Sequence, residues 1–118
     1  MTPPVNPRRR VRTFRGRVVN PVPWADLSVE RASAFGLAWG RCLQAVNEAG
    51  EEFLAVYGVV ARGGAWNVAL LDLATRTAYA ATAADEAAAR DLAESVVIAM
   101  LTCACAQAAL ANGLEQLR

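Results

Sequence analysis

The sequence predicts an α+β fold, in which an antiparallel meander of three strands, or of four, packs with two helices in the order (β)-α-β-β-β-α. Three observations support this. Residues 53–61 are apolar at both odd and even positions, and two strand-like segments follow after turn residues. Apolar residues recur at helical spacing on both sides of these segments. All five prolines precede residue 25, so we divide the chain into an extended N-terminal arm, residues 1–24, and one α+β domain, residues 25–118.

The arm is rich in arginine as well as proline. Six of the twelve basic residues lie in it without any acidic residue, whereas the domain has six arginines against eleven carboxylates, a formal charge of −5. Guanidinium groups bind phosphates bidentately, and a phenylalanine among them offers a stacking face. We predict that the arm docks on nucleic acid or on an acidic protein surface; an arm without a specific partner is the third alternative. Its binding residues are Arg8, Arg9, Arg10, Arg12, Phe14, Arg15 and Arg17.

The prolines also determine the expected backbone of the arm. Residues 1–9 are expected to be extended, because proline lacks an amide hydrogen and moves the preceding residue away from helical angles. Residues 10–19 are expected to form a strand that ends in the hinge Asn-Pro-Val-Pro, residues 20–23. Trp24 follows, and we expect its large ring to pin the root of the arm to the domain.

A first helix is predicted from residue 28 to residue 50. Ser28 is a favourable N-cap, and Gly50 is a favourable C-terminal stop. Large apolar residues recur between them at steps of four, four and three: Phe35, Trp39, Leu43 and Val46. A second row contains small residues: Ala32, Gly36 and Gly40. Because glycine in a helix interior is unfavourable by about 1 kcal/mol relative to alanine, this row predicts close packing against a helix or a sheet.

The predicted meander consists of residues 53–61, 66–73 and 76–81. Arg62-Gly63-Gly64 supplies the first turn and residues 74–75 the second. Asp72 lies where the second strand ends, and an aspartate at such a position commonly accepts hydrogen bonds from the turn backbone. A functional carboxylate in a pocket is the alternative interpretation of Asp72.

The last predicted element is one long helix, residues 83–111, capped by Thr82 and stopped by Asn112-Gly113. At ~1.5 Å per residue it would be about 43 Å long, whereas a compact chain of this size is about 35 Å across. We therefore expect the helix to pair with a second subunit, so that the chain is a homo-oligomer. The predicted interface residues follow an alternating spacing of four and three: Leu92, Val96, Ala99, Cys103, Ala106 and Leu110.

Residues 95–114 carry no charge over the length of a membrane span. Alanine dominates them and polar residues interrupt them, so we predict a buried helix and no membrane partner. Three cysteines without a secretory signal argue against a disulfide framework, and we expect an intracellular (cytoplasmic) location or one in a virion-type particle. Cys103 and Cys105 would point about 200° apart around a helix, so they are not expected to share a metal ion.

The chain contains no histidine, which removes the commonest general base and metal ligand. We predict that it is not an enzyme and has neither a cofactor nor a metal site. The favoured function is a non-enzymatic assembly or binding subunit, with a layout similar to that of small structural components of virions and other nucleoprotein assemblies. The alternatives are a nucleic-acid-binding regulatory protein whose arm contacts phosphates, and a small ligand-binding or enzymatic domain with its site between sheet and helix.

The order helix, three strands, helix resembles that of double-stranded RNA-binding domains. Those domains have a lysine cluster at the start of the second helix, whereas this chain has Asp85, Glu86 and Asp91 with only Arg90 among them. An acidic helix start repels a duplex, so the resemblance is limited to the order of the elements.

Overall fold

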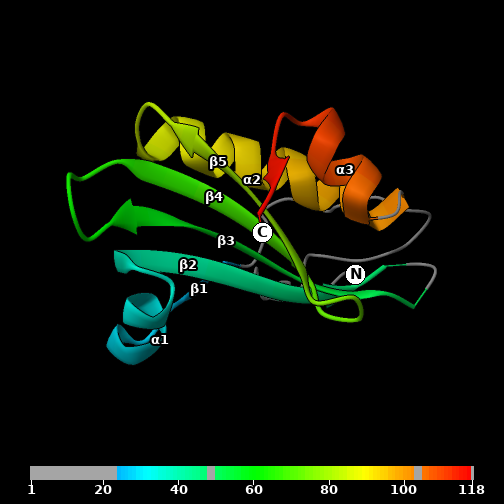
Figure 1. The fold of residues 1–118 in the computed structure, drawn as a ribbon, viewed down its shortest axis with the longest axis horizontal. Helices are drawn as coiled ribbons and strands as arrows, with labels where there is room; N and C mark the ends of the chain where they lie inside the picture. The colour runs from blue at the N-terminus through cyan, green and yellow to red at the C-terminus, as the bar shows by residue number, and fades with distance from the viewer. Residues whose placement is uncertain (1–23, 48–49, 103–104, 118) are drawn as a thin grey trace, which may run out of the picture.

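The computed structural model describes residues 24–47, 50–102 and 105–117. It has an α+β fold with one antiparallel six-stranded sheet, in which the strands are adjacent in chain order. The strands are β1 (Ala25–Asp26), β2 (Leu37–Val46), β3 (Glu52–Val60), β4 (Trp66–Asp72), β5 (Thr77–Ala83) and β6 (Glu115–Gln116) (Figure 1). The predicted strand over residues 10–19 and all seven predicted arm residues lie outside the described ranges.

The predicted meander is confirmed in β3, β4 and β5, and it extends further on both sides. β3 is buried on both faces, as its continuous apolar sequence predicts: Phe53 and Leu54 are adjacent and point to opposite faces, and both are buried. Gly63 and Gly64 have positive φ in the turn between β3 and β4. The Asp72 carboxylate accepts hydrogen bonds from the backbone N–H groups of Ala74 (3.1 Å) and Thr75 (3.3 Å), which confirms its turn role.

The predicted helix over residues 28–50 is wrong beyond its first turns. Helix α1 spans only Val29–Ala34, capped as predicted by Ser28, whose Oγ accepts from the Arg31 N–H at 3.2 Å. Gly36 then adopts φ +73°, and β2 begins at Leu37. The apolar spacing is ambiguous, because Trp39 and Leu43 lie on one side of a helix and also on one face of a strand. Pairing with the central β3 decides for the strand.

The glycines in this segment do indicate close packing, but between two strands. Gly40 lies directly opposite Gly58 in the β2–β3 ladder, next to an irregularity between Leu37 and Trp39. A Cβ atom on Gly58 would collide with the carbonyl oxygen of Trp39 and lie 2.9 Å from the Gly40 Cα. The two backbones therefore approach each other at a point where side chains do not fit.

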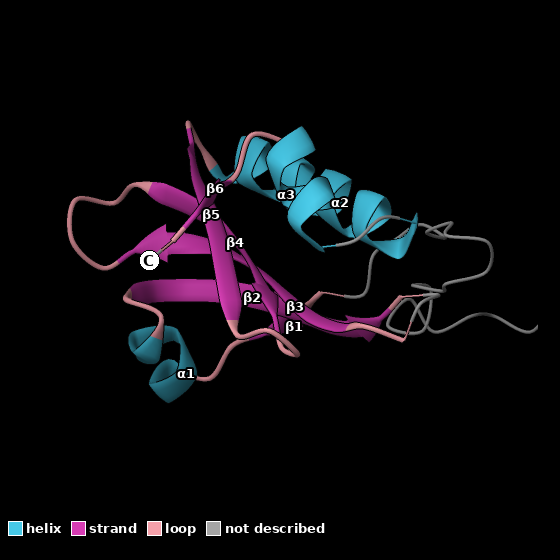
Figure 2. Cartoon of the chain, turned by 45° about the vertical axis from the view of Figure 1, so that its right-hand side comes forward, coloured by secondary structure: helices cyan, strands magenta, loops and turns pink. Residues whose placement is uncertain are grey.

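The predicted single helix over residues 83–111 is also wrong. The structure has two helices, α2 (Glu86–Thr102) and α3 (Cys105–Ala111), on the same side of the sheet (Figure 2). Asp85, not Thr82, caps α2: its carboxylate accepts from the Ala88 N–H at 2.8 Å, whereas Thr82 belongs to β5. At ~1.5 Å per residue α2 is about 25 Å long, close to the length of the strands that it covers.

The predicted stop after residue 111 is confirmed. Gly113 has φ +86°, and the N–H of Leu114 bonds to the Ala109 carbonyl at 2.9 Å. Leu114 is buried, and the chain returns to the sheet as β6. Among the described residues, no helix has both the length and the apolar character needed to cross a bilayer.

The core has two unequal parts. The larger lies between the sheet and α2, where Tyr57, Leu70 and Met100 are among the buried side chains. The smaller lies on the opposite face, where α1 covers part of β2 and β3 and where Ala32, Cys42 and Val56 are buried. Because α1 has only six residues, it covers this second face incompletely (Figure 2).

Candidate functional site: the open face of the sheet

The part of the second face that α1 leaves uncovered is formed by β4, β5 and β6. Strand register places Asn67, Ala69 and Leu71 of β4 beside Thr82, Ala80 and Ala78 of β5, respectively. The next strand adds Glu115, opposite Ala80, and the adjoining Leu117, whose N–H bonds to the Ala78 carbonyl. We call this surface the open face.

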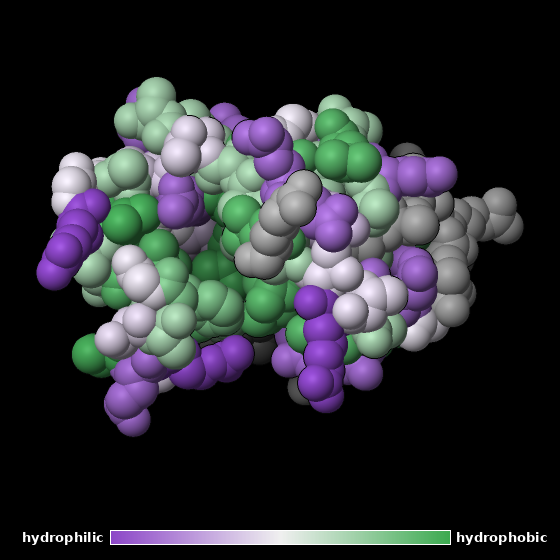
Figure 3. Space-filling model, in the orientation of Figure 1, coloured by the Kyte–Doolittle hydropathy of each residue, from purple (hydrophilic) through white to green (hydrophobic). Residues whose placement is uncertain are grey.

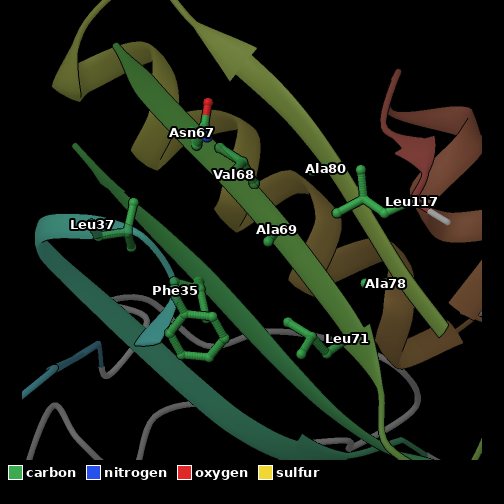
Figure 4. Close-up of a pocket in the computed structure, with 10 residues that line it drawn as sticks. Phe35, Leu37, Asn67, Val68, Ala69, Leu71, Ala78, Ala80 and Leu117 are labelled. Atoms are coloured by element: carbon green, nitrogen blue, oxygen red, sulfur yellow. The ribbon is translucent and has the colours of Figure 1, made fainter. Parts of the chain in front are cut away.

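The open face contains an apolar hollow of about 180 Å³. Figure 3 shows hydrophobic residues gathered at the centre of this side of the molecule. Its floor is made of small side chains, whereas larger side chains rise around it: Leu117 on the β6 side, and Phe35 and Leu37 on the α1 side (Figure 4). The lining residues are Phe35, Leu37, Val56, Asn67, Val68, Ala69, Leu71, Ala78, Ala80 and Leu117.

The lining of the hollow is apolar and lacks reactive groups. Asn67, near the start of β4, is the only polar residue of the lining, and no lining residue is ionisable or carries a hydroxyl or thiol group (Figure 4). General acid–base and nucleophilic catalysis need such groups. Leu117 is 51% exposed at the rim, so an apolar side chain stands in water beside the apolar depression. The hollow can therefore hold an apolar group, but its lining supplies no catalyst.

The root of the arm lies on the other side of the sheet. Trp24 is 8% exposed, its ring meets that of Tyr57 edge to face at 5.0 Å, and its Nε1–H donates to Glu94 of α2 at 2.9 Å. The prediction that Trp24 packs on the domain is confirmed. Trp39 and Trp66 extend the aromatic contacts from Tyr57, so these rings pack between sheet and helix.

The surface of α2 beside Trp24 is acidic. A depression there is lined by Glu86, Ala87, Arg90, Asp91 and Glu94. The Arg90 guanidinium bonds to the Glu94 carboxylate at 3.1 Å, and this hydrogen bond raises the pKa of Arg90. One cation among three carboxylates leaves the surface negative, so it does not suit a polyanion.

The predicted oligomer interface is not one continuous face. Val96 is fully buried in the chain's own core, so it does not reach a second subunit, and Leu92 and Ala99 are partly buried against the same core. Ala106 and Leu110 are exposed on α3, Leu110 by 59%, and Cys103 lies outside the described ranges. The side chains of α2 that were predicted to pair with a partner therefore pack on the sheet.

Burial raises the pKa of Cys42, the one cysteine whose side chain the structure describes, while the charge of Arg31 lowers it. A buried thiol of raised pKa is a packing group. Within the described ranges, no three side chains of metal-binding type lie together.

Sequence reasoning missed the open face. Its signal is the alternation of Ala78, Ala80 and Thr82 with the buried Tyr79, which marks a strand with one face on the core and the other uncovered.

Comparisons with protein families, with curated proteins and with solved structures found no match for this chain.

One buried hydroxyl gives a testable result. Tyr57 is 1% exposed, and its Oη makes no hydrogen bond of ordinary geometry with the described residues, although the Arg41 side chain lies near enough to favour the phenolate. Because an unsatisfied buried hydroxyl is unfavourable by about 1–3 kcal/mol, Tyr57→Phe should raise the free energy of unfolding by about 1 kcal/mol. Tyr79→Phe is the matched control, since Tyr79 is a buried tyrosine of the same sheet that does have interaction partners, and it should bring no gain.

The same hydroxyl predicts a pH dependence. Burial raises the pKa of Tyr57 above its ordinary value of 10.0, an effect that the charges of Arg41 and Arg90 oppose. The folded state therefore favours the neutral phenol, and the stability that this contributes is complete below pH 10 and is lost as the pH rises further. Urea titrations between pH 8 and pH 11 should show a shallower alkaline decline for Tyr57→Phe than for the parent chain. Parallel declines would contradict the assignment.

Proposed function

We propose that this chain is a non-enzymatic assembly subunit, which self-associates through the open face of its sheet and docks its arginine-rich arm on an anionic partner. The open face supports the proposal most directly. Domains are built from packed layers, and here the third layer is only partly present because α1 covers β2 and β3 alone. A second copy can complete that layer over β4 and β5.

The size of the hollow supports a protein side chain as its occupant. Pockets for cofactors and drug-sized ligands usually measure about 300–1,000 Å³. At about 180 Å³ this hollow is smaller, and it has no charged group to orient a metabolite. A small ligand-binding or enzymatic domain is therefore the less favoured alternative.

The charge distribution supports the arm as the contact with an anion. The domain carries −5 and the arm +6 at neutral pH. Glu94 bonds to Trp24, the last residue of the arm, and Glu86 and Asp91 line the same depression. The domain surface at that point therefore repels a polyanion. Binding of a phosphate backbone or an acidic protein is then the task of residues 8–17.

The test compares the full chain with a chain that lacks residues 2–19. Light scattering measures mass over a concentration series, and retention is measured with a 30-base-pair duplex and with poly-glutamate. Both chains should self-associate, while only the full chain should be retained by a polyanion. If all six arginines meet DNA phosphates, the slope of log affinity against log salt should be about −5.

The two polyanions distinguish between nucleic acid and an acidic protein as the partner of the arm. Retention by duplex alone favours the nucleic-acid-binding regulator, and retention by poly-glutamate favours docking on an acidic protein. A full chain that stays monomeric at every concentration and is retained by neither polyanion would contradict the proposed function.

A further inference from the structure

We propose that two copies pack open face to open face around a twofold axis, so that Leu117 of each copy fills the hollow of the other. This inference rests on the proposed function and specifies its interface. The open face carries both halves of the contact: an exposed apolar side chain and, next to it, a depression with a floor of alanines. Under twofold symmetry, the exposed side chain of each copy meets the depression of the other copy.

The hollow has the size and lining for one aliphatic side chain. Ala69, Ala78 and Ala80 leave room above β4 and β5 (Figure 4). The walls are apolar apart from Asn67, whose buried Oδ1 has no hydrogen-bond partner among the described residues. An apolar cavity of about 150 Å³ accommodates a benzene-sized group in another protein, so a hollow of this size has room for a leucine side chain. Insertion would remove Leu117 from water and cover the alanines at the same time.

Charge favours this face over the helical side for contact between copies. The outer surface of α2 presents Glu86, Asp91 and Glu94, and two such surfaces would repel each other. The hollow has no charged lining residue, and the whole chain has a formal charge of only +1, so two copies do not repel strongly at a distance. The open face as a whole carries one carboxylate, the exposed Glu115 of β6, so two copies meet with less electrostatic opposition there than on the outer surface of α2.

The area available predicts a weak dimer. β4 and β5 have seven residues each and β6 has two. At about 3.3 Å per residue and about 4.8 Å between strands, these three strands present on the order of 250 Å² from each copy. The total is well below the ~1,200 Å² at which stable complexes begin. We expect a concentration-dependent dimer, which becomes stronger when the arms of both copies bind one polyanion, because the second contact is then intramolecular.

The experiment blocks the hollow in one variant and removes Leu117 in another. Ala80→Phe places a ring on the floor of the hollow, and Leu117→Ala removes the inserted side chain. Each variant alone should lose most of the dimer in sedimentation equilibrium, by about tenfold or more in dissociation constant. An equimolar mixture should recover dimer, because Leu117 of the Ala80→Phe variant meets the intact hollow of the Leu117→Ala variant. On the other side of the axis, the alanine at position 117 faces the blocked hollow and does not collide with it.

Leu110→Ala on α3 is the matched control, because it removes a similarly exposed leucine away from this face and should leave the dimer unchanged. Thermal unfolding checks that each variant is folded, and Ala78→Leu is a milder second block of the hollow. Loss of the dimer with Ala80→Phe but not with Leu117→Ala, and without recovery on mixing, would overturn the reciprocal insertion and leave the open face as the interface. An unchanged dimer in every open-face variant would exclude this face altogether.

Discussion

Replacing Gly58 with alanine is expected to lower the free energy of unfolding by about 3 kcal/mol, near the upper end of the usual effect of overpacking. The new Cβ would collide with the Trp39 carbonyl oxygen and lie 2.8 Å from a Leu37 methyl carbon. Two of the nearest atoms belong to the backbone of β2, so they can move only if the β2–β3 ladder opens. Urea denaturation with circular dichroism measures the loss as a lower midpoint.

Gly64→Ala is the control for this substitution. Gly64 has φ +68°, and no atom lies within 4 Å of the position that a Cβ would take there, so alanine meets only the left-handed backbone penalty of about 1–2 kcal/mol. Gly58→Ala should therefore be clearly the more destabilising of the two. Equal losses would show that the β2–β3 contact yields more easily than the structure indicates.

Trp24→Ala is expected to destabilise the domain by about 3 kcal/mol, the lower end of the range for removing a buried tryptophan or phenylalanine ring. The ring contacts Tyr57 and closes the gap between the sheet and α2, and its indole N–H bonds to Glu94. Differential scanning calorimetry should show a lower melting temperature, because the substitution leaves a cavity over Tyr57.

Trp24→Phe separates packing from hydrogen bonding. Phenylalanine keeps an aromatic ring against Tyr57 but loses the bond to Glu94 and part of the buried ring volume, so we expect a loss of about 1–2 kcal/mol, smaller than that of Trp24→Ala. Arg90 still pairs with the same Glu94 carboxylate, which therefore keeps a partner. An unchanged melting temperature for Trp24→Ala would mean that the root of the arm does not contribute to the fold.

The elements with unambiguous local signals were predicted correctly. β3 is apolar at every position from Phe53 to Val56, and only a strand covered on both faces accommodates that pattern in a sheet of this size. Ser28, Asp72 and Gly113 each act through hydrogen bonds or backbone angles within a few residues, so their roles are visible without knowledge of the tertiary structure.

The errors arose where local and distant interactions compete. Trp39 and Leu43 fit one side of a helix, but they also lie on one face of β2. Pairing with β3 selects the strand, and this pairing cannot be recognised from the local sequence. The long C-terminal helix was predicted from its capping residues and from apolar residues spaced alternately by four and three. The structure has two helices on one side of the sheet, which places Val96 in the core instead of in a subunit interface.

The amino-acid sequence alone determined the separation of a positive arm from a negative domain, the meander that includes residues 53–60, and the helix ends at Ser28 and Gly113. Charge, apolar alternation and helix capping depend only on residue type and near neighbours, so they can be recognised without the tertiary structure. Only the tertiary structure decided that residues 37–46 form a strand, that α2 packs its apolar side on the sheet, and that β4 and β5 keep an open apolar face. These features depend on which surfaces meet, and burial between segments distant in the chain outweighs local preference.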